Sequence, residues 1–141
     1  MALTPSTMLA LGSALPAFRL PVVSGSLSET AAAEVLNSNE LPAQPLLVML
    51  ICAHCPFVKH VEPELSRLAD HYRPAVTLLA VSSNSLTTHP QDGPDGLRHQ
   101  AEQRQWTFPY LLDEQQSRAK ALKGACTPEF YLFSPDGSGL Q

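Results

Sequence analysis

The sequence has little positive charge and no long apolar run, and each scarcity excludes a class of protein. Its 141 residues include 9 lysines and arginines against 13 acidic residues, so the chain lacks the basic surplus of a nucleic-acid-binding protein. The longest unbroken apolar run, residues 46–53, is far shorter than the roughly 20 residues of a membrane span. No cationic residue precedes Arg19 to form the n-region of a signal peptide. We therefore expect a cytoplasmic protein that binds neither nucleic acid nor a membrane.

Cysteine is also scarce, with three residues in the whole chain: Cys52, Cys55 and Cys126. Their number and spacing do not fit a small disulfide-rich secreted scaffold, and in a reducing cytosol a close pair is more often catalytic or metal-binding. The sequence has no second Cys-x-x-Cys pair, and no lysine follows a glycine as the Gly-Lys-Ser/Thr phosphate loop requires. We accordingly expect no metal and no organic cofactor.

Hydrophobic residues make up 44% of the chain, enough to bury the core of one domain over residues 1–141. Residues 1–17 carry no charge and little periodicity, so we expect an extended lead-in there. Apolar runs then alternate with amphipathic segments, which predicts an α/β fold with early strands that are parallel and buried. The expected strands are 18–23, 46–51, 75–81, 108–112 and 130–133; the expected helices are 28–36, 57–72, 96–106 and 113–123.

The segment 57–72 places apolar residues at helical spacing, with charged residues between them. This pattern predicts an amphipathic helix that begins near the cysteine pair. Its charged residues are expected to form a solvated face. They are Glu62, Glu64, Arg67 and Asp70.

The last expected strand ends at a strong turn signal, Ser134-Pro135-Asp136-Gly137, with only residues 138–141 after it. Such a turn predicts the second strand of a hairpin, and most of that strand is missing from the sequence. Either the chain is truncated, or another chain completes this edge of the sheet, as in a homodimer.

The motif Cys52-Ala53-His54-Cys55 lies between the apolar strand 46–51 and the helix that follows. A thiolate at a helix N-terminus is stabilised by the helix dipole and by unpaired amides, which lowers its pKa, and a thiol three positions along resolves a mixed disulfide. We expect Cys52 to be the exposed nucleophile, Cys55 the more buried resolving thiol, and His54 a donor that favours the thiolate. The pattern predicts a redox dithiol.

Several segments around this motif share a family pattern: residues 12–20, 46–57, 108–113, and Thr127-Pro128 before the strand 130–133. They resemble the thioredoxin-like superfamily and, within it, the redoxin branch of alkyl hydroperoxide reductases and thiol-specific antioxidant proteins. The resemblance implies a central mixed sheet flanked by helices, with the dithiol at the start of the first main helix. It also implies that Thr127 and Pro128 form a cis-proline loop that docks a peptide substrate. Cys126 would then lie near the dithiol, as a third thiol or as a small buried apolar side chain.

We therefore predict a thiol-disulfide oxidoreductase whose Cys52–Cys55 pair acts on a protein or small-molecule disulfide and exchanges electrons with an external thiol reductant or oxidant. A thiol peroxidase of the peroxiredoxin type is an alternative. When Cys55-Pro56 is aligned with the peroxidatic Cys-Pro of that family, Cys52 stands where the family has a hydroxyl residue and Val48 where it has a proline. Both residues that support the peroxidatic site are therefore absent. Two further alternatives stay open: a zinc or iron-sulfur centre with Cys126, His54 or His60 as added ligands, and a redox-inactive interaction module.

Overall fold

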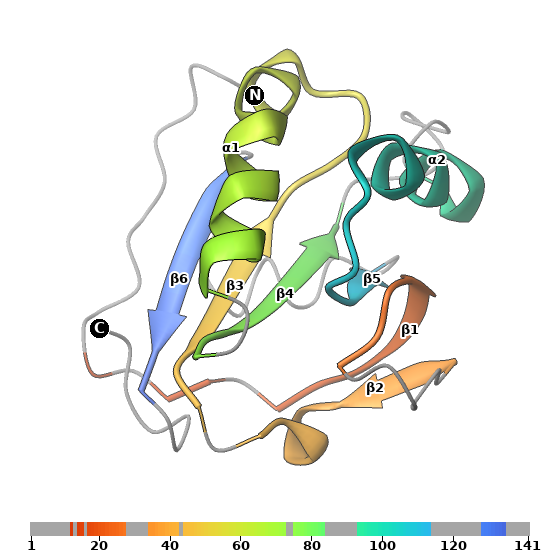
Figure 1. Cartoon of the computed structure of the whole chain (residues 1–141). Coiled ribbons are helices and arrows are strands. Elements are labelled where there is room, and N and C mark those ends of the chain that lie inside the picture. Colours follow the sequence, from red (N-terminus) through yellow and green to blue (C-terminus); the bar gives the residue numbers. More distant parts are fainter. Residues whose placement is uncertain are drawn as a thin grey trace.

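The computed structural model describes residues 12, 14–15, 17–27, 34–42, 44–72, 75–83, 93–113 and 128–134 (Figure 1). These residues form strands β1 (Arg19–Ser24), β2 (Val35–Asn37), β3 (Leu46–Leu50), β4 (Thr77–Ser82), β5 (Tyr110–Leu112) and β6 (Glu129–Phe133), the short 3-10 helix η1 (Ser38–Glu40), and helices α1 (Pro56–Tyr72) and α2 (Pro94–Arg104). Neither α1 nor α2 has the length and apolar character needed to cross a membrane.

The strands form one mixed sheet in the order β2-β1-β5-β4-β3-β6. Strand β4 is parallel to both β3 and β5, whereas β1 pairs with β5, and β6 with β3, in the antiparallel sense. Strand β3 is thus paired on both sides, and its side chains are buried on both faces of the sheet, which explains why its apolar run lacks alternation. This topology confirms the predicted α/β fold and its buried parallel strands. It also brings the carboxyl ends of β3, β4 and β5 to one edge of the sheet.

Each face of the sheet buries its own hydrophobic core. The first core lies between the sheet and the two helices, and Figure 1 shows α1 in front of β3 and α2 above β5 in the view. Its members include Met49 of β3, Leu65 of α1 and Leu97 of α2. The second core, on the opposite face, includes Leu79 of β4 and Leu111 of β5. The central strands therefore contribute side chains to both cores.

Helix α1 begins directly after the cysteine motif, as predicted, and continues through Pro63 to Tyr72. Its buried stripe consists of Val58, Glu62, Leu65 and Ala69, at spacings of four, three and four residues. Two residues expected on the apolar face, Phe57 and Tyr72, are instead 54% and 48% exposed, because they lie at the ends of the helix.

The expected helix 28–36 is wrong at its end, because Val35 and Leu36 belong to β2. Leu36 pairs with Leu20 of β1 in an antiparallel ladder and is buried in the second core. Pairing and burial override the weak helical preference of the local sequence at these positions. Residues 28–33, the helix 114–123, residues 84–92 of the expected loop, the turn 135–137 and most of the lead-in lie outside the described residues.

Candidate active site

The cysteine motif connects strand β3, in the interior of the sheet, to the start of α1. After β3 ends, the Ile51 amide still donates a hydrogen bond to the Val81 carbonyl of β4, at 3.1 Å, so the backbone remains tied to the sheet up to Cys52. Cys55 immediately precedes the helix, and its carbonyl accepts a hydrogen bond from the Lys59 amide at 3.1 Å. The two thiols therefore lie at the two ends of a short connection whose ends are both fixed.

The relative exposure of the two cysteines is the reverse of the expectation from sequence. Cys52 is 0% exposed and Cys55 is 8% exposed, and both are thiols in this structure. Both belong to the first core, and Cys52 is the more buried because it directly follows the strand, whereas Cys55 lies where the chain turns into α1. The half-buried His54 lies between them. The positive end of the α1 dipole therefore acts most directly on Cys55.

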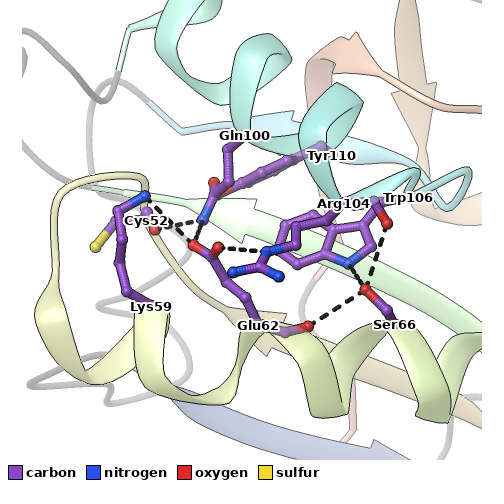
Figure 2. Close-up of polar contacts among 8 residues, drawn as sticks. All are labelled: Cys52, Lys59, Glu62, Ser66, Gln100, Arg104, Trp106 and Tyr110. Atoms are coloured by element: carbon purple, nitrogen blue, oxygen red, sulfur yellow. Dashed lines mark hydrogen bonds and ion pairs between the residues drawn. The ribbon is translucent and has the colours of Figure 1, made fainter.

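A buried amide from α2 binds the backbone of the motif (Figure 2). Gln100 donates from Nε2 to the Cys52 carbonyl at 3.0 Å and to Glu62 Oε2 at 2.9 Å. Its Oε1 accepts a hydrogen bond from the Tyr110 hydroxyl at 2.7 Å. One side chain thus connects the end of β3, helix α1 and strand β5.

Glu62 is 3% exposed, although the sequence pattern predicted that it faces solvent. Its Oε1 accepts a hydrogen bond from Arg104 Nε at 2.9 Å, and its Oε2 lies 3.5 Å from Lys59 Nζ. Two cations and the Gln100 amide therefore compensate the burial of this charge. The signal for this burial is present in the sequence, because Glu62 lies four residues after Val58 and three before Leu65, on the apolar stripe of α1.

Further polar groups lie at the carboxyl ends of the neighbouring strands. The amide of Asp113, directly after β5, donates to the Ser82 carbonyl at 2.8 Å. The Asp113 carboxylate accepts a hydrogen bond from the Ser83 hydroxyl at 2.9 Å and is buried. Ser82 Oγ is buried with no hydrogen-bond partner among the described residues. Sequence reasoning assigned none of these residues to the site, since only the parallel pairing of β4 and β5 brings them together.

Of the expected docking residues, the structure describes Pro128, which directly precedes β6. Because Glu129 pairs with Leu50 in the antiparallel ladder, Pro128 lies at the end of the sheet where β3 leads into the cysteine motif. Thr127 and Cys126 lie outside the described residues. Within the described part of the chain, no group of three His, Cys, Asp or Glu side chains is arranged to hold a metal ion, and His60 is exposed on α1.

Comparisons with known proteins match nearly the whole chain. A model of the AhpC/TSA family matches residues 11–138. The crystal structure of an uncharacterized conserved protein from Geobacillus kaustophilus has a TM-score of 0.85 and 40% identity, covering 95% of this chain and 68% of that one. A hypothetical protein from Sinorhizobium meliloti has a TM-score of 0.84 and 29% identity, covering 96% and 70%. A secreted Mycobacterium tuberculosis disulfide oxidoreductase has the same fold, with a TM-score of 0.68, 19% identity, and coverage of 86% and 79%. No curated protein matches the chain.

Proposed function

The chain belongs to the AhpC/TSA family, and from that premise we propose that it is a thiol-disulfide oxidoreductase whose redox pair is Cys52 and Cys55. One observation supports this proposal above the others: two thiols, three residues apart, lie between a buried strand end and a helix N-terminus. This arrangement provides a thiolate-stabilising position and a resolving thiol within the same short connection. The similarity in fold to a protein described as a disulfide oxidoreductase is consistent with it.

The exposures favour Cys55 as the attacking thiol and Cys52 as the resolving thiol, the reverse of the roles expected from sequence. The Cys55 thiolate attacks a substrate disulfide, forms a mixed disulfide and releases one substrate thiolate. The Cys52 thiolate then attacks the Cys55 sulfur, forms the Cys52–Cys55 disulfide and releases the second substrate thiolate. Two electrons have passed from the protein to the substrate, and an external thiol reductant returns them. With an external oxidant the same steps run in reverse.

The remaining predicted site residues have supporting roles in this proposal. His54, between the two cysteines, favours the thiolate by donating a hydrogen bond or carrying positive charge. Pro128, at the same end of the sheet as the motif, and Thr127 shape the surface on which a protein or small-molecule disulfide docks. Cys126 remains a candidate third thiol.

The test is a glutathione redox titration in which thiols are trapped by alkylation and located by mass spectrometry. We expect a reversible two-electron couple between Cys52 and Cys55 in the wild type and in a Cys126→Ser control. Cys52→Ser should accumulate a mixed disulfide of glutathione with Cys55, because the resolving thiol is missing. Cys55→Ser should form less mixed disulfide at the remaining thiol of the pair, because Cys52 is more buried than Cys55.

Four other outcomes would point to different functions or roles. Absence of a reversible couple in the wild type would rule out the oxidoreductase proposal. Mixed disulfide at Cys52 in Cys55→Ser, with none at Cys55 in Cys52→Ser, would restore the roles expected from sequence. Rapid consumption of hydrogen peroxide that survives Cys52→Ser would favour a peroxidase with Cys55 as the peroxidatic thiol. Zinc or iron that co-purifies and is lost with either substitution would favour a metal centre.

A further inference from the structure

We propose that Gln100 is a positioning residue for the redox pair, which holds the Cys52 backbone in place for disulfide formation. This inference rests on the proposed function, because it concerns the same pair of thiols. Its basis is the buried hydrogen bond from Gln100 Nε2 to the Cys52 carbonyl at 3.0 Å. The two residues are 48 positions apart, so the bond depends on how α2 packs against the motif.

The neighbours of the Gln100 amide determine its orientation. The Cys52 carbonyl and the Glu62 carboxylate can only accept hydrogen bonds, so the amide nitrogen must face both of them. The amide oxygen is then left to accept the hydrogen bond from the Tyr110 hydroxyl. A flipped amide would put its oxygen against two acceptors in a buried site, which is unfavourable. The donor that faces Cys52 is therefore fixed.

The partners of Gln100 are themselves held in place. Glu62 is buried and bonded to Arg104, and Tyr110 is fully buried in the first core. Figure 2 shows these side chains converging between α1, α2 and β5, with the Cys52 carbonyl at one end of the chain of contacts. Because the other partners of Gln100 are packed in place, its hydrogen bond restrains the backbone of Cys52.

Fixing this backbone favours the disulfide over the dithiol. Disulfide geometry requires a narrow range of Cα and Cβ separations, and a backbone that is already fixed at both ends loses less entropy on closure. The Cys55 end is held by α1 through the Lys59 amide, and the Cys52 end by the Val81 carbonyl, which accepts from Ile51, and by Gln100. Loss of the Gln100 amide removes one restraint on the Cys52 end and leaves the restraint on the Cys55 end unchanged.

The measured quantity is the equilibrium constant Kox for the reaction of the reduced protein with oxidised glutathione. One protein dithiol and one glutathione disulfide give one protein disulfide and two glutathione thiols, so both electrons and both thiol protons pass to glutathione. Gln100→Met keeps the length of the side chain and removes its hydrogen bonds. We expect Kox to fall about three- to tenfold, the effect of losing one buried hydrogen bond. Tyr110→Phe, which removes only the hydroxyl that donates to the amide oxygen, should give a smaller fall.

Ser66→Ala is the matched control. Ser66 Oγ accepts from Trp106 Nε1 at 2.9 Å and lies 3.4 Å from the Arg104 carbonyl, so it joins α1 to the end of α2 with no bond to Cys52. Both variants should unfold at a lower urea concentration than the wild type. Only Gln100→Met should change Kox. The Kox of Ser66→Ala should stay within about 1.5-fold of the wild-type value, because the hydrogen bonds that this variant loses do not involve Cys52.

A second measurement tests the positioning role without any redox couple. Alkylation of the reduced native protein, followed at each cysteine by mass spectrometry, should be at least about threefold faster at Cys52 in Gln100→Met than in the wild type, with Cys55 unchanged. A wild type with no reversible couple would contradict the proposed function, and the alkylation rates would still decide the role of Gln100. Gln100→Met values equal to those of Ser66→Ala in both measurements would overturn the inference. If Gln100→Met fails to fold, Tyr110→Phe is judged by the same two measurements.

Discussion

At the residue scale, the buried carboxylate of Glu62 is the side chain of the site that most needs compensating partners. An isolated charge in the core of a protein is strongly unfavourable, and it persists only where hydrogen bonds and opposite charges surround it. Here Arg104, Lys59 and Gln100 supply them. Because Arg104 and Lys59 are themselves partly exposed, they can return to water if the carboxylate is lost. Gln100 is buried, so its amide cannot turn to water in the same way.

We expect Glu62→Ala to lower the free energy of unfolding by about 2–3 kcal/mol, because it leaves the buried Gln100 amide with one hydrogen-bond partner fewer. Urea denaturation followed by fluorescence measures this loss. Glu64→Ala is the control on the same helix, since Glu64 pairs with Arg67 on an exposed surface and its removal should change stability by less than about 0.5 kcal/mol. Equal losses in the two variants would show that Glu62 is solvated in solution.

At the element scale, helix α1 contains two prolines in positions of different consequence. Pro56 is its first residue, where the amide has no acceptor within the helix. Pro63 lies in the interior, where it cannot donate to the Lys59 carbonyl and its ring crowds that carbonyl. Both prolines are exposed, so neither is required for packing in the core.

Pro63→Ala should therefore be more stable than Pro56→Ala by about 1–2 kcal/mol. Each substitution gives the unfolded chain similar extra freedom, so that contribution cancels between the two variants. Only Pro63→Ala restores a hydrogen bond and relieves a clash inside the helix. Urea midpoints at an unchanged slope give the difference directly. Equal midpoints would mean that the helix accommodates Pro63 without penalty.

Elements with strong local signals were predictable from the sequence, and those decided by distant contacts were not. The apolar run of β3 and the helical spacing in α1 are local, and both elements occur where expected. Strand β2 depends on pairing with β1, and its sequence alone favoured a helix. The burial of Glu62 depends on Gln100, which is 38 residues away in the sequence. The cysteine motif was therefore found, whereas the polar network behind it and the order of exposure of its thiols were missed.

At the scale of the whole molecule, one sheet connects the two hydrophobic cores. Strands β3, β4 and β5 alternate side chains between the core under the helices and the core on the opposite face. A substitution that destabilises one core therefore also destabilises the strands that form part of the other core. The cysteine motif begins at the end of β3, so its geometry depends on both cores.

This coupling predicts that a substitution in the second core lowers the stability of the first. Leu79→Ala, at a fully buried position of β4, should cost about 2–5 kcal/mol. Trp106 is the only tryptophan and lies in the first core, so its fluorescence reports on the face that the substitution does not touch. The fluorescence and far-ultraviolet circular dichroism transitions should shift together to the same lower urea concentration. Leu132→Ala, the same change at an exposed position of β6, should shift both only slightly. A Trp106 transition that keeps its wild-type midpoint in Leu79→Ala, while the dichroism transition moves, would show that the two cores unfold independently.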